Sequence, residues 1–268
     1  MNQKLKLLLF FILLFIFFIF FGDLFISNSA YQLNKNSILS APSFEHFFGT
    51  DRLGRDVFAR VIEGGKISLV IGVGSGLIGT FIGLIIGISA GFFKGNTDKS
   101  IVVLIDLFLT FPTFFLLLAL VSYVEASSLV LIAVISITGW MGTARMIRSE
   151  SFGIANKPFI KILKLGNVSK SKIIFKYYVP LIAPIFLISF TFGVSGAILA
   201  ESGLSFLGLG VMPPQMSWGS MLAEGKEVMD IAWWVSFFPG LCIFIISFLL
   251  IQMSDFLQNI FNQKEKTI

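Results

Sequence analysis

Side chains that could perform catalytic chemistry are scarce in this chain. It has one histidine, His46, and one cysteine, Cys242, so neither a Cys–His nucleophile pair nor a zinc site with several histidines can be assembled. The run Gly64-Gly65-Lys66 is followed by Ile67 and lacks the upstream glycine of a phosphate-binding loop. The sequence therefore predicts a chain that is not an enzyme and that binds no metal, nucleotide or other cofactor itself. We interpret His46 as a surface residue of a loop, because a metal contact there would have no second ligand.

Charge is concentrated in one interruption of an otherwise apolar chain, residues 145–176. It holds eight basic residues and one acid, Glu150. The basic residues are Arg145, Arg148, Lys157, Lys161, Lys164, Lys170, Lys172 and Lys176. The stretch separates two apolar runs that are each long enough to cross a bilayer, so a compact loop there is suited to dock a partner on one side of a membrane. The residues alone equally allow an amphipathic helix that lies on anionic lipid.

The composition requires lipid as the solvent for most of the chain. Of the 268 residues, 56% are hydrophobic, 13% are charged and 32 are phenylalanine, and the mean hydropathy is +0.90. A soluble domain carries about 25% charged residues and could not bury this much apolar surface. The net charge of +5 does not indicate nucleic-acid binding, because the basic residues lie near the ends of apolar runs. The chain is therefore predicted to be an all-α membrane protein embedded in a lipid bilayer.

Six stretches are apolar enough to span the ~30 Å of hydrocarbon in a bilayer. They are residues 5–26, 67–90, 101–123, 128–143, 178–200 and 234–250. The first stretch follows Lys4 and Lys6 and precedes Asn28-Ser29-Ala30, which resembles a signal-peptide cleavage site. Its apolar core is longer than that of a signal peptide, so we prefer a retained transmembrane helix to a cleaved signal.

The distribution of basic residues predicts the orientation. With the N-terminus inside, the inner segments carry most of the lysine and arginine, and the outer segments carry more acids than bases. Both termini are therefore predicted to be cytoplasmic, and the mixed charges of residues 51–60 are tolerated in a translocated loop. The predicted organisation is an N-terminal transmembrane helix (1–27), an external segment (28–66), a transmembrane domain (67–257) with an inner loop (144–177) and an outer loop (201–233), and a cytoplasmic tail (258–268).

Glycines and prolines predict how the spans pack and bend. Glycine recurs every four residues from Gly79 to Gly91, a spacing that lets another helix backbone approach one face closely. We prefer tight helix packing as the reason, and lining of a translocation path is the alternative. Proline removes a backbone donor and kinks a membrane helix. The predicted kinks are at Pro112, Pro180 and Pro184.

Asp106 is an acid inside the third predicted span. An ionisable residue within a membrane is a functional candidate, for example in proton-coupled transport. Asp106 lies near the predicted inner end of its span, so it can also reach the interface or pair with a basic residue. We prefer the second interpretation.

The basic loop has a helix–turn–helix pattern. A short amphipathic helix is predicted over Phe159, Ile160, Lys161, Ile162, Leu163, Lys164 and Leu165. Gly166 and Asn167 can end it, because both residue types tolerate the left-handed conformation of a helix end. A second helical pattern starts at Ser169, and Pro180 leads into the fifth span. The pattern predicts a compact knob on the inner side of the membrane.

Three motifs together resemble one transporter family. They are Phe-Gly-Thr-Asp-Arg-Leu-Gly-Arg-Asp-Val-Phe-Ala-Arg at 48–60, Asp-Leu-Phe-Leu-Thr-Phe-Pro-Thr at 106–113, and Glu-Ser-Gly-Leu-Ser-Phe-Leu-Gly-Leu-Gly at 201–210 with Pro-Pro and Ser-Trp-Gly after it. In this order they resemble the permease subunits of the dipeptide, oligopeptide and nickel ABC importers, and most of all the second of the two permeases. The resemblance covers about residues 45–255 and implies a type I ABC importer permease with a cytoplasmic coupling helix in a bacterial inner membrane. The external signature residues that it identifies are Gly49, Thr50, Asp51, Gly54, Arg55, Asp56, Glu201, Gly203, Ser205, Phe206, Gly208, Gly210 and Trp218.

The resemblance also implies partners. A related permease subunit would form a heterodimer with this chain, two ATPase subunits would hold ATP and Mg, and an extracytoplasmic binding protein would deliver the substrate. In this family the coupling helix has a Glu-Ala-Ala motif followed by glycine and lies in a groove of the ATPase. Here the motif falls on residues 161–163, Lys-Ile-Leu, the family's glycine falls on Asn167, and Gly166 stands one position early. We expect docking to persist through shape and apolar contact, and we interpret residues 204–210 as structural bracing rather than a binding-protein contact.

Three classes of function remain open from the sequence. The leading one is an ABC importer permease for peptides or nickel, between which the motifs do not discriminate. A secondary carrier would couple substrate to proton or ion flux through Asp106, and a membrane scaffold would bind partners without transport. Secondary carriers often contain inverted internal repeats, and none is evident in this sequence.

Overall fold

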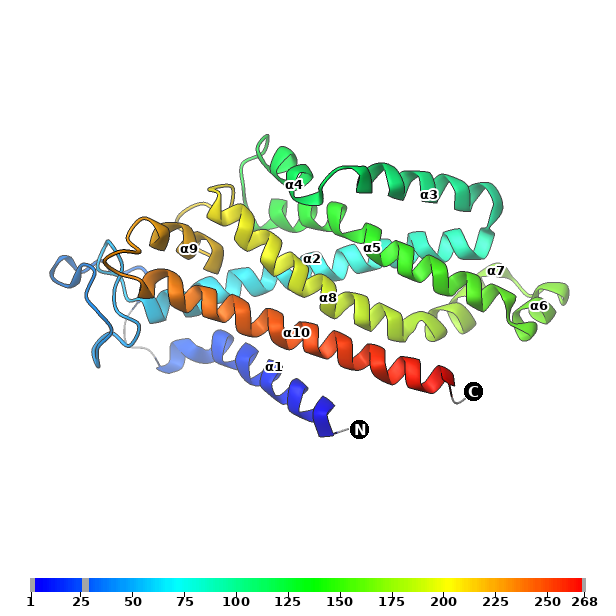
Figure 1. Ribbon diagram of the computed structural model, residues 1–268, viewed down its shortest axis with the longest axis horizontal. Coiled ribbons are helices and arrows are strands. Elements are labelled where there is room, and N and C mark those ends of the chain that lie inside the picture. The colour runs from blue at the N-terminus through cyan, green and yellow to red at the C-terminus, as the bar shows by residue number, and fades with distance from the viewer. Residues whose placement is uncertain (1–2, 26–28, 267–268) are drawn as a thin grey trace.

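The long helices lie side by side along one axis. The computed structural model describes residues 3–25 and 29–266, and these residues form helices and no β-strand. The long helices α2, α5, α8 and α10 run along the length of the molecule, and α1 lies beside α10 (Figure 1). Their bounds are Val57–Phe93 for α2, Ser128–Asn156 for α5, Val179–Phe206 for α8, Trp234–Lys266 for α10 and Gln3–Phe21 for α1.

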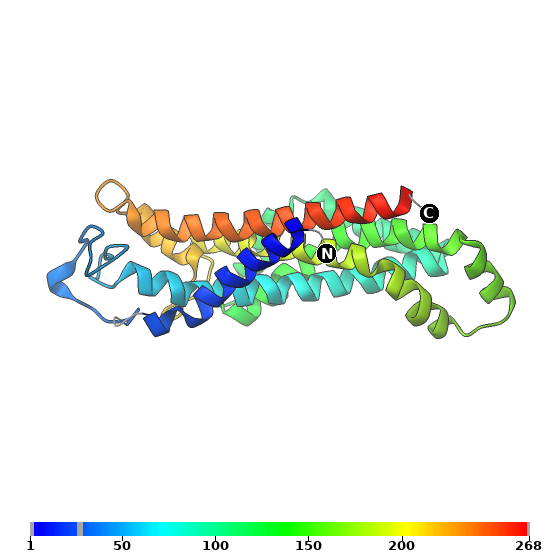
Figure 2. The ribbon, with the colours of Figure 1, turned by 90° about the horizontal axis from the view of Figure 1, so that it is seen from below.

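The short elements gather at the two ends of this bundle. α6 (Pro158–Leu165) and α7 (Lys170–Ile173) lie at one end, and α9 (Trp218–Lys226) and the loop of residues 29–56 lie at the other (Figures 1 and 2). We call these the α6 end and the α9 end. The start of α1 and the end of α10 both point toward the α6 end (Figure 1).

One predicted span is broken in two. Five described helices are long and apolar enough to cross a membrane, and α3 (Gly95–Thr110) and α4 (Thr113–Val121) form a further pair bent by 80°. The prediction of about six transmembrane helices is confirmed if the bent pair α3 and α4 is taken as one span. Pro112 has no amide hydrogen and holds Phe111 in an extended conformation, with φ −90° and ψ 135°. The kink predicted at Pro112 is therefore a complete break in the helix.

α2 begins ten residues before the predicted span that starts at residue 67. The helix begins at Val57, because the Asp56 carboxylate accepts the Ala59 amide hydrogen at 3.0 Å and caps the first turn. The last ten residues of the segment predicted to be external, 57–66, are therefore helical. The predicted end of the first span at residue 26, the boundary at 27–28 and Asn28 of the cleavage-like sequence lie outside the described residues.

Three other helices also extend beyond the predicted spans. α5 continues to Asn156 within the predicted inner loop 144–177, and α8 continues to Phe206 within the predicted outer loop 201–233. α10 continues to Lys266, so most of the predicted tail 258–268 is helical. Hydropathy marks only the part of a helix that lies in hydrocarbon, whereas a helix continues into the aqueous phase as long as its backbone bonds and side-chain partners hold it.

The glycines of α2 let this helix sit between α5 and α8. A Cβ at Gly72 would lie 2.4 Å from the Ile198 side chain of α8, and one at Gly87 would lie 2.8 Å from the Ala144 carbonyl oxygen of α5. Gly83 and Gly91 likewise face the α5 backbone or side chains at less than 3 Å. Contacts this short are possible only without a Cβ, so the packing interpretation of the glycine stripe is confirmed for these positions.

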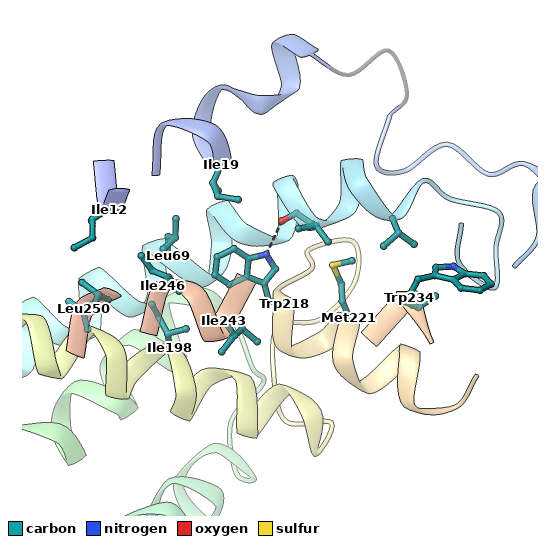
Figure 3. Close-up of a cluster of buried hydrophobic side chains, with 14 of the residues drawn as sticks. Ile12, Ile19, Leu69, Ile198, Trp218, Met221, Trp234, Ile243, Ile246 and Leu250 are labelled. Atoms are coloured by element: carbon teal, nitrogen blue, oxygen red, sulfur yellow. Dashed lines mark hydrogen bonds between the residues drawn. The ribbon is translucent and has the colours of Figure 1, made fainter. Parts of the chain in front are cut away.

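The largest apolar cluster surrounds one tryptophan. Trp218, at the start of α9, is fully buried, and its Nε1 donates to the Val61 carbonyl oxygen of α2 at 2.8 Å (Figure 3). Four other helices supply side chains around it, among them Ile19 from α1, Leu69 from α2, Ile198 from α8, and Ile243 and Ile246 from α10 (Figure 3). The cluster holds α9 and α1 onto the three central helices.

Glycine packing gives a direct stability test. Gly87→Ala places a Cβ against the α5 backbone, so we expect it to lower the free energy of unfolding by about 1–3 kcal/mol. Gly142→Ala is the matched control, because a Cβ there meets no atom within 4 Å, and its better helix propensity should raise stability by about 0.5–1 kcal/mol. Thermal unfolding of the purified protein in detergent measures both, and equal effects would contradict the packing role.

Candidate functional site

α6 has two faces with different surroundings. It begins at Pro158, whose fixed φ and missing amide hydrogen suit the first position of a helix. On one face Ile160 is fully buried, and Leu163 packs on the same apolar cluster. The opposite face exposes Ile162 and Leu165, with exposed fractions of 67% and 83%. We call these two side chains the outer ridge. An exposed apolar ridge on a firmly seated helix is suited to bind another protein.

The end of α6 depends on Asn167. Its φ is +55°, in the left-handed region, whereas Gly166 has a φ of −77°. The Val168 amide donates to the Leu163 carbonyl at 3.1 Å. The Asn167 amide donates to the Lys164 carbonyl at 3.2 Å, and the two bonds form a Schellman motif. The position at which the resemblance places the family's glycine therefore has the backbone conformation that glycine favours, and asparagine tolerates it.

A π-helical turn joins α7 to α8. The turn covers Ile174–Tyr178, and Pro180 follows it in the first turn of α8. Such turns help a membrane helix accommodate the missing donor of a proline. The π turn therefore lies just before the position at which the kink of Pro180 is predicted. Pro184 lies inside α8, and the helix continues through it.

Two ion pairs tie α3 to α5. Asp106 accepts from Arg145 at 2.7 Å, and both side chains are more than half exposed. Asp98 accepts from Arg148 in a bidentate pair at 2.5 and 2.9 Å. Asp106 therefore forms an ion pair with Arg145, the first basic residue after the fourth predicted span. This agrees with the preferred interpretation, in which Asp106 reaches the interface or pairs with a basic residue.

Four charged side chains form a clamp at the α9 end: Asp51, Arg55, Arg60 and Glu224. Asp51 accepts from Arg55 Nε at 2.6 Å and from Arg60 Nη1 at 2.5 Å. Glu224 accepts from Arg60 at 2.7 and 3.0 Å and from Arg55 at 3.0 Å. The side chains of Arg60 and Asp51 have exposed fractions of only 1% and 2%. The clamp joins the loop before α2, the first turn of α2 and α9.

Two glycines shape the loop that leads into the clamp. Gly49 has a φ of +72° and Gly54 a φ of +71°. A Cβ at Gly54 would lie 1.8 Å from the Asn34 carbonyl oxygen, so this part of the loop closes only with glycine. Thr50 is fully buried, and its carbonyl accepts from Trp234 Nε1 at 3.0 Å. The signature residues of this segment therefore anchor the loop to α10.

His46 lies in a loop, as interpreted, but its side chain is only partly exposed and has a structural partner. Its Nδ1 lies 2.7 Å from the Asp56 carboxylate, and its side chain has an exposed fraction of 16%. Because Asp56 also caps α2, the histidine holds the capping carboxylate in place. No sequence pattern indicates this contact, because a lone histidine in a loop has no periodicity.

Glu201 is the centre of a second buried polar network. It accepts from Ser205 Oγ at 2.6 Å and from Ser68 Oγ of α2 at 3.2 Å. Ser68 Oγ in turn accepts from the Trp218 amide at 3.1 Å, and Ser217 Oγ donates to Ser205 Oγ at 3.3 Å. These bonds join the end of α8, the middle of α2 and the start of α9.

The turn after α8 closes back on this network. Gly208 has a φ of +83°, and a Cβ at Gly210 would lie 1.8 Å from Ser205 Oγ. Phe206 is partly exposed, and the Lys226 ammonium lies 5.0 Å from the centre of its ring. The 201–210 signature therefore braces this chain internally.

A cavity of about 250 Å³ lies between α2, α4, α5 and α8. The residues that line it include glycines and hydroxyl side chains and no charged side chain. A Cβ at Gly139 or Gly196 would meet no atom within 4 Å, so these two lining glycines face open space. α4 reaches the cavity by packing on α8, where a Cβ at Gly203 would lie 3.1 Å from the Phe114 ring. The lining hydroxyls are those of Ser75, Thr80, Thr113, Thr138 and Thr143.

Sequence reasoning missed Arg60, Glu224 and Ser68 as members of these networks. Arg60 had a usable signal, because an arginine in the first turn of an apolar helix and nine residues after Asp51 must find an acid. Glu224 had none, since its contact with Arg60 spans 164 residues of sequence.

Comparison with known proteins places the chain in a family. Residues 83–267 match the family described as binding-protein-dependent transport system inner membrane component. The chain belongs to this family. The matched residues run from Gly83, within α2, to the end of α10, and they include α6, Glu201 and the residues of α4, α5 and α8 that line the cavity. The protein is therefore a multi-pass inner-membrane permease component and not an enzyme.

Individual relatives support the assignment. The permease is 32% identical to the oligopeptide transport system permease protein OppC of Haemophilus influenzae, over 86% of this chain and 75% of that one. It is 33% identical to OppC of Bacillus subtilis, over 82% and 74%, and 38% identical to a putative peptide permease protein of Brucella suis, over 75% and 67%. The solved inward-facing MetNI methionine ABC transporter has a chain that aligns with a TM-score of 0.58 at 14% identity, over 74% of this chain and 95% of that one. That likeness shows the fold, which is of the type I ABC importer permease class.

The left-handed residue at the end of α6 can be tested by substitution. Asn167→Val forces a β-branched residue to φ +55°, which should open the helix end by about 1–2 kcal/mol and speed hydrogen exchange of residues 158–168 by about tenfold. Asn167→Gly should leave exchange unchanged. Gly166→Ala is the matched control, because its φ of −77° suits any residue. A larger effect at Gly166 than at Asn167 would contradict the assignment of the motif.

The clamp can be tested at Arg60. Arg60→Met leaves Asp51 buried with one cationic partner fewer, so we expect a loss of about 3 kcal/mol in the free energy of unfolding. Arg52→Met is the control: Arg52 pairs with Glu227 at the surface, where an ion pair contributes less than about 1 kcal/mol. Thermal unfolding in detergent gives both values. Equal losses would show that the clamp contributes no more to stability than a surface ion pair does.

Proposed function

We propose that this permease is one of two related transmembrane subunits of an ATP-driven importer and that the importer carries dipeptides or oligopeptides. The observation that supports coupling to ATP most directly is the outer ridge, Ile162 and Leu165, on a helix whose other face is buried. A partner ATPase would cover this ridge. ATP and Mg would be held by two such ATPases, and this chain would bind neither.

The proposed mechanism couples two equilibria through rigid contacts. Closure of the ATPases on ATP would move α6, and α6 is joined to α5 by a single residue, Lys157, and to α8 by α7 and the π turn. Motion at the ridge would therefore be passed directly to two of the helices that line the cavity. A related permease subunit would supply the other half of the path. Each nucleotide state would favour one arrangement because it makes different contacts in the two.

The cavity supports a peptide rather than nickel as cargo. Its lining contains no histidine, cysteine or carboxylate, and nickel prefers imidazole and thiolate ligands. Hydroxyls and glycine backbone are suited to a larger molecule with its own amide groups. The relatives with "oligopeptide" or "peptide" in their names agree with this choice.

The orientation that we propose places the α6 end in the cytoplasm. Lysines gather on the knob of α6 and α7, and the start of α1 and the end of α10 point the same way (Figure 1). Both termini would then be cytoplasmic, which agrees with the positive-inside rule. The α9 end would face the extracytoplasmic binding protein.

No specific observation favours the other two functions. The secondary-carrier hypothesis assigns proton or ion coupling to Asp106. The structure pairs this side chain with Arg145. A scaffold without transport would not require a cavity between the spans.

Uptake by whole cells tests the proposal. Cells with and without this gene are supplied with labelled dipeptide, labelled tripeptide and labelled nickel, with and without ATP depletion. We expect gene-dependent and ATP-dependent uptake of peptide alone. Gene-dependent nickel uptake without peptide uptake would overturn the cargo, and uptake that survives ATP depletion would overturn the ATP-driven mechanism.

A variant of the outer ridge tests its role in coupling. Ile162→Asp with Leu165→Asp should lower peptide uptake at least about tenfold while membrane insertion stays normal, because charge on the ridge opposes apolar docking. Ile162→Met with Leu165→Met is the control and should retain uptake. Leu163 is avoided because it packs inward, so a charge there would also damage the fold. Normal uptake by the double Asp variant would exclude the ridge from coupling.

A further inference from the structure

A second surface of the knob forms a basic pocket. It lies between the end of α2, the end of α6 and α7, and encloses about 430 Å³. The residues that line it are Phe92, Phe93, Lys164, Asn167, Val168, Ser169, Lys170 and Ile173. Its lining thus combines aromatic and aliphatic side chains with two ammonium groups, an amide and a hydroxyl.

The two lysines are held over aromatic rings. The Lys164 ammonium lies 4.6 Å from the centre of the Phe92 ring, and the Lys170 ammonium lies 5.7 Å from that of Phe93. Among the side chains that the structure describes, those of residues 3–24 and 29–262, the ion pairs found do not include Lys164 or Lys170. Partial burial and, next, the charge of Lys94 lower the pKa of Lys164 below its ordinary value. The pocket therefore concentrates like charges that an anion would relieve.

The pocket lies where the apolar part of α2 ends. Phe92 and Phe93 are the last residues of α2, and Lys94 follows them directly. The apolar part of this span ends at that point, which is where a bilayer changes from hydrocarbon to phosphate. Phe93, in the lining of the pocket, is half exposed, and Phe175, on the π turn after α7, is 74% exposed.

The pocket faces away from the outer ridge. Lys164 follows Ile160 by one helical turn on α6, and Ile160 is on the buried face. Ile162 and Leu165 are on the opposite face. A ligand in the pocket and a protein on the ridge can therefore occupy α6 at the same time.

We propose that this pocket binds the headgroup phosphate of an anionic phospholipid, with Lys164 and Lys170 as its cationic contacts and Phe92 and Phe93 beneath the start of the acyl chains. Basic pockets between helices at the cytoplasmic surface are suited to such headgroups, because charge and hydrocarbon meet there. The lipid would fix the distance between the end of α2 and the end of α6. This inference needs only the membrane position of the knob and holds for any cargo.

Lipid binding to the purified full-length protein tests the proposal. The delipidated protein is titrated with phosphatidylglycerol and with phosphatidylcholine in detergent, and retained lipid is counted by native mass spectrometry. We expect one phosphatidylglycerol to bind at least about tenfold more tightly than phosphatidylcholine. Lys164→Gln with Lys170→Gln should abolish this preference. Equal retention of the two lipids by the unaltered protein would overturn the proposal.

A matched variant separates the pocket from general charge. Lys157→Gln with Lys176→Gln removes the same charge from the same segment, and both lysines are exposed outside the pocket. It should keep the preference, and an equal loss in the two double variants would overturn the pocket as the site. Displacement of the lipid by millimolar inorganic phosphate would assign a free-anion site instead. Loss of the lipid when the ATPase subunits are added would assign the pocket to an acidic surface of the ATPase.

Discussion

The close approach of α2 to α5 and α8 is the constraint on which the rest of the structure depends. Glycine from Gly72 to Gly91 brings helix backbones into contact, and no larger residue fits at Gly72, Gly83, Gly87 or Gly91 without movement. A helix of 37 residues extends about 55 Å, so α2 reaches from one end of the bundle to the other. Its first turn carries Arg60 of the clamp, and its last turn carries the two phenylalanines that line the basic pocket. A displacement of α2 would therefore disturb both ends together.

The buried polar networks at the α9 end serve a different purpose from the glycine contacts. Apolar packing in a membrane is weakly directional, because lipid tails solvate a leucine as well as a neighbouring helix does. Asp51, Arg60 and Glu201 are costly to bury and are tolerated only with their partners in place. They consequently select one register between the loop before α2, α8 and α9. The hydroxyls of Ser68, Ser205 and Ser217 supply the hydrogen bonds around Glu201, and they do so without adding charge.

The sequence predicted those features that depend on local pattern. Apolar length predicted the spans, four-residue glycine spacing predicted the packing of α2, and alternation of apolar and basic residues predicted the α6–α7 knob. Helix ends were predicted poorly, because polar residues that continue a helix beyond the hydrocarbon resemble those of a loop, as in residues 144–156 of α5. The α3–α4 angle and the pairing of Arg60 with Glu224 depend on contacts between distant segments. The contact of His46 with Asp56 was missed for the same reason, since it is set by how the loop closes on α2.

The degenerate motif of α6 shows which properties a docking helix of this kind must keep. The Glu-Ala pair of the family is replaced by Lys161 and Ile162, yet α6 retains a buried face, an exposed apolar ridge and a defined end. The end survives because Asn167 adopts the left-handed conformation in place of glycine, at a small steric cost. Ile162, in place of alanine, enlarges the ridge rather than removing it. Under the proposed function, the groove of the partner ATPase must accommodate this larger side chain, and specificity between the two subunits would follow from matched volume rather than from a salt bridge.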